Sequence, residues 1–193
     1  INTPEKLLNF LKVETKGYRV ITLGSSAGGF AAVIYGQLLN AERILSFNGQ
    51  FEISSLLDKS SEKTDPLIFR NRSNSELNQW YCSRNFILNP TTIFYFQSIK
   101  SEWDTEQYNY IRDLSINHIQ FNTSNHGIPF LKTNLDFVIN KSLDELIQMK
   151  NRINHPVSFS IKSVGFLPTA FALISIIRFG LKKIYIKTFL KAR

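Results

Sequence analysis

The sequence predicts an α/β fold with a mostly parallel sheet that is covered by helices on both faces. Short apolar, β-branched stretches alternate with helical stretches over residues 3–139. Hydrophobic residues make up 43% of the chain and charged residues 20%, which is the balance of a globular domain. Phenylalanine is abundant, with 16 of 193 residues, and this favours a packed interior. A chain of this length suffices for one domain with a proper core.

The helices and strands are expected where the spacing of apolar residues changes. Residues 3–13 are predicted to be helical, because Thr3 is a good N-cap and Pro4 suits the first turn. Short apolar runs predict buried strands, and longer apolar stretches with small residues predict helices packed on a sheet. The expected strands are 18–23, 43–47, 92–96 and 116–121, and the other expected helices are 30–39, 104–114 and 129–139.

Residues 51–90 interrupt this alternation. They are polar and irregular, with helical patches near Ile53–Leu57 and Ser75–Tyr81. We interpret them as an insertion or lid. The sequence therefore divides into a main domain over residues 1–150, which contains this insertion, and a C-terminal tail over residues 151–193.

The net charge of +8 comes from the tail. Residues 150–193 contain nine Lys or Arg and no Asp or Glu, whereas residues 1–149 carry 14 basic and 15 acidic groups. The main domain is thus close to neutral. The high isoelectric point therefore does not indicate a protein that binds nucleic acid.

Cys82 is the single cysteine, so an internal disulfide is excluded and a reducing, cytoplasmic compartment is expected. We interpret Cys82 as a small hydrophobic residue rather than a nucleophile. The chain clusters too few ligands for zinc, and no metal or redox cofactor is implied. Because Ile1 directly precedes a predicted helix, we expect that upstream sequence is missing.

The segment that indicates a catalytic function is the motif G-x-S-x-G over residues 24–28, with Ser26 at its centre. It lies between a predicted strand and a predicted helix, where a nucleophile elbow is required. Such a turn holds the serine in a strained backbone conformation. The N-terminus of the helix directs its free N–H groups at the serine, so the N–H of Ala27 is the expected oxyanion donor.

Glycine and alanine surround the serine on both sides. We expect Gly24 and Gly28 to leave room for the neighbouring chain, and Gly29 and Ala31 to let the helix pack closely. Two phosphate-binding motifs fit less well: Phe30 stands where a Walker A motif needs lysine, and Ser26 stands where a dinucleotide motif needs glycine. A purely structural turn is the remaining alternative.

A serine nucleophile needs a base, and the base needs an acid to orient it. Of the three histidines, His126 follows the strand 116–121 through a polar loop and is the expected base. His118 lies inside that strand, where a structural role is expected. His155 is expected to lie in a loop.

The loop after the strand 92–96 offers the acid. Asp104 is the first choice, although its position at the start of a helix also fits a simple N-cap. Glu102 is the second choice and Asp113 the third.

Residues 18–137, which contain these candidate residues, resemble the C-terminal half of the α/β-hydrolase family. The matching pieces are the elbow, Asp104 before its helix, and His126-Gly127, in the family's order along the chain. The resemblance implies that Ser26 is the nucleophile, Asp104 the acid and His126 the base. It also implies that residues 1–150 form a hydrolase-like catalytic domain without the N-terminal strands, since the family's second oxyanion donor follows an earlier strand.

Within that family, residues 23–32 are most similar to bacterial enzymes of surface-polysaccharide synthesis, including capsule O-acetyltransferases. The resemblance implies a serine esterase or O-acetyltransferase that acts on a carbohydrate, with acetyl-CoA as the acyl donor of a transferase. Trp80 and Tyr81 are candidates to stack on a sugar ring, and Arg84, with Arg70 and Arg72, to meet an anionic group. The alternatives are that the two aromatic residues pack the lid and that the arginines are solvated.

The tail combines an uncharged, largely apolar run over residues 163–177 with a basic stretch over residues 178–193. The apolar run is shorter than the 20 or so residues of a membrane-spanning helix. One hypothesis is that residues 163–193 lie on an anionic membrane surface at its inner face, with Lys182, Lys183, Lys187 and Lys191 near head groups. The other is that they form a helix docked on the domain or on a partner subunit.

Two non-enzymatic alternatives stay open. One is a hydrolase-fold scaffold without activity in polysaccharide assembly. The other is a lipid-interacting protein whose function depends mainly on the tail.

Overall fold

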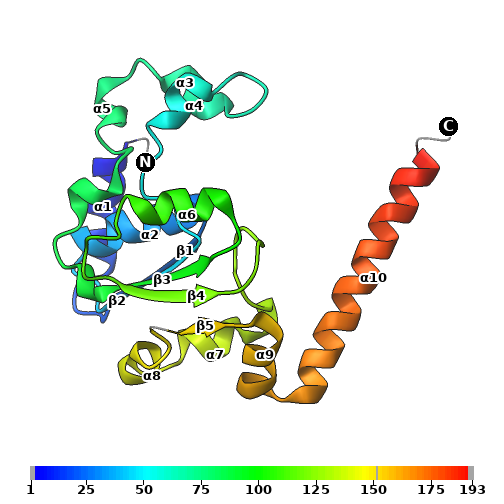
Figure 1. Cartoon of the computed structure of the whole chain (residues 1–193). Coiled ribbons are helices and arrows are strands. Elements are labelled where there is room, and N and C mark those ends of the chain that lie inside the picture. Colours follow the sequence, from blue (N-terminus) through cyan, green and yellow to red (C-terminus); the bar gives the residue numbers. More distant parts are fainter. Residues whose placement is uncertain (1–2, 151, 191–193) are drawn as a thin grey trace.

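The computed structural model describes residues 3–150 and 152–190, with side chains described up to Lys182, and its centre is a five-stranded sheet (Figure 1). All strands are parallel, and their spatial order follows the chain. The strands are β1 (Ile21–Ser25), β2 (Arg43–Phe47), β3 (Ile93–Ser98), β4 (Asn117–Phe121) and β5 (Ile153–Asn154). The predicted α/β fold with a parallel sheet is confirmed. Because the strands are parallel, the loops that follow them gather at one edge of the sheet.

Helices cover both faces of the sheet (Figure 1). One face packs beneath α2 (Ala27–Leu38) and α6 (Glu102–Asn109), around a core that includes Val33, Ile44 and Tyr95. The other face packs against α7 (Leu135–Ile139), α8 (Leu143–Ile147) and α9 (Pro156–Val164), around a cluster of phenylalanines. The helix α1 (Pro4–Glu14) precedes the sheet and starts, as predicted, with Thr3 as its N-cap.

The first strand differs from the prediction of a buried strand over residues 18–23. It starts at Ile21, and it lies at the edge of the sheet with a partner on one side only among the described residues. Tyr18, Ile21 and Leu23 are 77%, 40% and 47% exposed. The apolar pattern correctly predicts a strand. It does not predict whether another element packs against that strand and buries it.

Three predicted helices also differ in their bounds, and the helix expected over 30–39 begins three residues earlier, at Ala27. The helix expected over 104–114 begins at Glu102 and ends at Asn109, because Ser101 caps it three residues before Asp104. The stretch expected to be helical over 129–139 contains the 3-10 turn η3 (Lys132–Asn134) followed by α7. The strand β5 is a further element, and it pairs with β4 although it lies within the segment interpreted as the tail.

Within residues 51–90, three short helices lie outside the two layers, at the top of Figure 1: α3 (Ser55–Lys59), α4 (Pro66–Asn71) and α5 (Ser75–Asn78). The 3-10 turn η1 (Ser83–Phe86) contacts α2, and η2 (Pro90–Thr92) leads into β3. An antiparallel bridge between Glu52 and Cys82 closes the base of this segment.

The chain continues after α9 into the long helix α10 (Phe166–Leu190), which extends away from the sheet (Figure 1). Gly165 separates the two helices with a φ of 91°, a conformation that favours glycine. Residues 191–193, and so Lys191 of the hypothesis for the tail, lie outside the described residues, as do the side chains of Lys183 and Lys187. No helix within the described ranges combines the length and the apolar character needed to cross a membrane.

Candidate active site

Ser26 occupies a sharp turn between β1, which ends at Ser25, and α2, which begins at Ala27. Its backbone has φ 55° and ψ −122°, an unusual conformation for a residue other than glycine. The N–H of Ser26 donates to the carbonyl of Phe47 at 3.0 Å, which ties the turn to the end of β2. The strand–turn–helix context predicted for the motif is confirmed.

The glycines of the motif do not share one role. A Cβ on Gly24 would lie 2.1 Å from the carbonyl oxygen of Gly28. This position therefore requires glycine, because the backbone of Gly28 passes too close for a side chain. The expectation of a close approach at Gly28 is wrong, because a Cβ there would meet nothing within 4 Å. A Cβ on Gly29 would lie 2.6 Å from the Cα of Gly49, and a Cβ on Gly36 would collide with Thr22 and Ile44. These two glycines therefore allow the tight packing of the helix.

His126 lies in the loop after β4 and reaches Ser26 across the edge of the sheet. The distance from Ser26 Oγ to His126 Nε2 is 2.7 Å, a hydrogen-bond distance. The following residue, Gly127, has a φ of 115°, which lets the loop turn back toward the sheet. The imidazole side chain is 40% exposed, so solvent and ligands have access to one side of it.

Asp104 lies on the other side of the imidazole. His126 Nδ1 is 2.7 Å from Asp104 Oδ1, and the Asp104 side chain is fully buried. Asp104 is not the N-cap of α6: Ser101 is, because its hydroxyl accepts the N–H of Asp104. The alternative of a simple cap at Asp104 is therefore wrong, and its carboxylate is free to orient the histidine.

Side chains from β3 hold the backbone of Asp104. Its carbonyl accepts hydrogen bonds from the hydroxyl of Tyr95 at 3.3 Å and from Gln97 Nε2 at 3.4 Å. Desolvation by burial raises the pKa of Tyr95 well above 10, so this hydroxyl stays protonated and remains a donor. Asp104 thus lies in the first turn of α6, and two side chains of β3 tie its backbone to the sheet.

This geometry assembles the parts of a serine nucleophile. Nε2 is placed to accept the proton of Ser26 Oγ, while Nδ1–H donates to the carboxylate and so fixes the tautomer. Ala27 is exposed and is the first residue of α2, where an N–H group has no partner within the helix. Its N–H is therefore available to a developing oxyanion beside Ser26.

Asn48 is a residue of the site that the sequence did not reveal. Its side chain is fully buried, and Nδ2 donates to the carbonyls of Asn125 at 3.1 Å and Gly127 at 3.0 Å, on either side of His126. Oδ1 accepts the N–H of Ser98 at 2.7 Å. One amide therefore joins the ends of β2 and β3 to the loop that carries His126. The only signal was an Asn-Gly pair after a strand, which reads as an ordinary turn.

The other candidate histidines lie elsewhere. His118 Nε2 donates to Gln97 Oε1 at 2.7 Å, and its ring stacks on Tyr108 with centroids 3.9 Å apart. Burial lowers the pKa of His118 to about 4, as expected for a neutral structural histidine. His155 is exposed and is the N-cap of α9.

The second and third choices for the acid are also accounted for. Asp113 pairs with Arg84 through two hydrogen bonds of 2.6 Å, and these lower the pKa of Asp113 to about 2. Glu102 is exposed in the first turn of α6.

The residues expected to bind substrate have partners within the protein. The Trp80 ring stacks on Phe86 with centroids 4.8 Å apart, and its indole N–H donates to Glu5 at 3.0 Å. Tyr81 packs at the base of the same segment, where burial raises its pKa. Arg84 is held by Asp113 and by the carbonyl of Tyr110. A role of these three residues in substrate binding remains a prediction.

Cys82 is half-buried, and burial raises the pKa of its thiol, which disfavours the reactive thiolate. Among the described residues, no three His, Cys, Asp or Glu side chains gather in a way that would hold a metal ion.

Comparison with protein-family models, with curated proteins and with solved structures gave no match.

Proposed function

We propose that this chain is a serine-dependent acyl-transfer enzyme, an esterase or an O-acyltransferase. One observation carries the proposal: Ser26 Oγ lies 2.7 Å from His126 Nε2, and His126 Nδ1 lies 2.7 Å from the buried carboxylate of Asp104. A hydrogen-bonded series of this kind makes a serine hydroxyl nucleophilic on several unrelated folds.

The proposed reaction has two halves. His126 takes the proton of Ser26 as Oγ attacks the carbonyl carbon of the ester or thioester, and the N–H of Ala27 stabilises the oxyanion. The oxyanion then collapses, the bond to the leaving group breaks, and His126 returns the proton to that group. In the second half, His126 takes a proton from water or from a hydroxyl acceptor as its oxygen attacks the acyl carbon. The intermediate then collapses, the bond to Ser26 Oγ breaks, and His126 returns the proton to Oγ.

We extend the proposal to the fold and the substrate. The nucleophile, acid and base follow β1, β3 and β4 in that order, which is the order of α/β-hydrolases. We therefore propose a sheet of that type, with residues 51–90 as a lid and a carbohydrate as the substrate or acceptor. Acetyl-CoA is the donor that this proposal assigns to a transferase.

Intact-mass spectrometry after exposure to p-nitrophenyl acetate or acetyl-CoA tests the covalent step. We expect an acetyl adduct on the wild-type chain and no adduct on Ser26→Ala. Ser25→Ala is the matched control, because it removes the neighbouring hydroxyl and is expected to keep the adduct.

The fate of the adduct separates the two enzyme classes. Slow loss in water with faster loss on adding a sugar acceptor supports the transferase, whereas rapid loss in water supports the esterase. If the wild-type chain forms no adduct and turns over no ester, the proposal is wrong and a scaffold without activity is the better explanation.

A further inference from the structure

The base of α10 is fixed to the domain by a small buried polar cluster. Thr169, in the first turns of the helix, shares a hydrogen bond of 2.8 Å with the hydroxyl of Ser160 on α9. The same hydroxyl donates to Asn134 Oδ1 at 3.0 Å, and all three side chains are at most 2% exposed. The helix therefore leaves the domain in a defined direction rather than as a loose tail.

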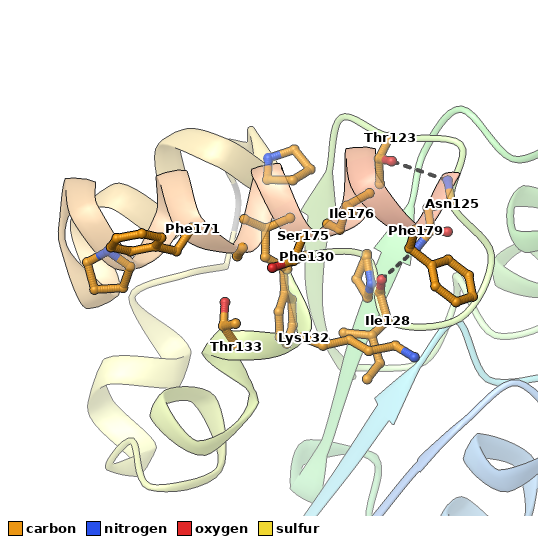
Figure 2. A pocket seen from close by; sticks show the side chains of 15 residues that line it. Thr123, Asn125, Ile128, Phe130, Lys132, Thr133, Phe171, Ser175, Ile176 and Phe179 are labelled. Atoms are coloured by element: carbon orange, nitrogen blue, oxygen red, sulfur yellow. Dashed lines mark hydrogen bonds between the residues drawn. The ribbon is translucent and has the colours of Figure 1, made fainter. Parts of the chain in front are cut away.

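One side of α10 faces the domain across a groove of about 790 Å³. Figure 2 shows Phe171, Ser175 and Phe179 of the helix on one wall of this groove and Ile128 on the opposite wall, and Asn125 also lines it. Asn125 and Ile128 flank His126-Gly127 in the chain, so the loop that carries the proposed base also lines this groove.

A second side of α10 carries an apolar stripe that faces away from the groove. Phe166, Ile174, Ile177 and Leu181 are 68%, 45%, 61% and 62% exposed. At 100° per residue, these positions lie within a quarter-turn of one another, roughly opposite the residues that line the groove. An exposed apolar stripe of this length on a helix is unfavourable in water and indicates a surface that it contacts.

The charges around the stripe indicate the nature of that surface. Arg178 is exposed at the border of the stripe, and Lys182 is exposed one turn further along, on the side that turns toward the groove. The sequence adds Lys183, Lys187, Lys191 and Arg193 after them. From residue 150 to residue 193 there are nine cationic side chains and no carboxylate. The complement of an apolar stripe bordered by uncompensated cations is an apolar layer bordered by anions.

We propose that α10 docks on an anionic lipid surface, with its outer apolar stripe among the acyl chains and Arg178 and Lys182 at the head groups. A second copy of the chain fits less well. Its stripe would bring two sets of cations together without a single carboxylate from this segment to offset them. Since α10 is anchored next to the His126 loop, docking would hold that loop near the lipid.

Vesicle flotation of the full chain tests the proposal, with Ser26→Ala protein so that the result does not depend on acyl transfer. Vesicles of phosphatidylcholine alone are compared with vesicles that also contain phosphatidylglycerol. We expect binding to the anionic vesicles and at least roughly tenfold weaker binding to the neutral ones. The charge variant R178E/K182E and the apolar variant I177N/L181N should each weaken binding roughly tenfold or more.

Two matched variants control for charge and for apolar surface in general. K12E/K16E makes the same change of charge on exposed residues at the other end of the chain, and L67N/L88N changes two leucines that are 75% and 74% exposed. Both should bind within about twofold of the parent.

The proposal is overturned by equal binding to both vesicle types, by no binding, or by unchanged binding of I177N/L181N. Self-association in sedimentation velocity that I177N/L181N abolishes, without vesicle binding, would assign the stripe to a second copy instead.

Discussion

At the scale of single residues, the site depends on conformations that cost free energy and are held by neighbours. Ser26 has a φ of 55°, a strain worth about 1–3 kcal/mol. Hydrogen bonds offset that strain, since Ser26 N–H donates to Phe47 and the Ser26 carbonyl accepts from Phe30 at 3.1 Å. The hydroxyl is thereby presented at the tip of the strand, in reach of His126.

Asp104→Asn should abolish most activity without loss of stability. The amide can no longer secure the histidine tautomer that leaves Nε2 free, and comparable triads lose about 10⁴ in kcat from this change. The free energy of unfolding should not fall, because Asp104 Oδ2 is buried without a hydrogen-bond partner and a neutral side chain is cheaper to bury.

The measurement is ester hydrolysis beside urea unfolding. Asp113→Asn is the control, since it removes an exposed carboxylate that pairs with Arg84, and it should keep activity. Equal activity of Asp104→Asn and wild type would exclude Asp104 from the reaction.

Asn48→Gly should lower kcat by roughly 100-fold with little change in KM, because the His126 loop loses its link to β2 and β3 while the substrate contacts remain. Glycine tolerates the φ of 44° at this position, so the backbone is kept. Asn40→Gly makes the same exchange at a φ of 51° at the C-terminal end of α2 and should leave kcat unchanged.

Asn48 acts here as a positioning residue, so steady-state kinetics should be accompanied by the pH profile of kcat. A shifted or broadened profile in Asn48→Gly supports a disturbed His126. A variant that loses stability while its profile and its kcat stay those of wild type would reduce Asn48 to a structural role.

At the scale of elements, the sequence predicted what depends on local pattern and missed what depends on distant contacts. The strand over 43–47 agrees to the residue, because its apolar residues stand close together and all five of its residues are buried. The two-residue strand β5 is too short to leave a pattern, and it exists only because β4 lies beside it.

The same division holds for the candidate site. Ser26, Asp104 and His126 follow strands in a recognisable order, so they could be chosen from the sequence. Asn48 could not be chosen, because its partners lie 50 to 79 residues further along the chain.

Ser160→Ala should weaken the joint between α9, α10 and η3. The lost hydroxyl removes one hydrogen bond each from Asn134 Oδ1 and Thr169, which keep their bonds to Thr133 and to the carbonyl of Gly165. The free energy of unfolding should therefore fall by about 0.5–1.5 kcal/mol. Ser163→Ala on the same helix is the control, because its half-buried hydroxyl bonds only back to the carbonyl of Phe159 within the helix.

Urea unfolding and hydrogen exchange of α10 are the two readouts. Ser160→Ala should lower both the midpoint and the protection of the first turns of α10, and Ser163→Ala should change the midpoint by less than about 0.5 kcal/mol. If the two variants behave alike, the polar cluster does not fix the direction of α10.

At the scale of the whole molecule, its stability should depend on pH through the half-buried His118. His118 joins β4 to Gln97 of β3 and to Tyr108 of α6, so its protonation affects both the sheet and a covering helix. Burial lowers its pKa from 6.5 to about 4. Between these two values the unfolded chain binds a proton at this position that the folded chain does not.

The free energy of unfolding should therefore be fully retained above pH 6.5 and fall progressively as the pH drops toward 4. His118→Gln keeps a donor for Gln97 but cannot be protonated, so it should lose less stability over this window. From pH 7 to pH 5, the free energy of unfolding should fall by roughly 1–2 kcal/mol more in wild type than in His118→Gln. Urea unfolding of both proteins at the two pH values measures it, and the cost of the substitution itself cancels in the difference. Parallel losses in the two proteins would show that other groups cause the acid sensitivity.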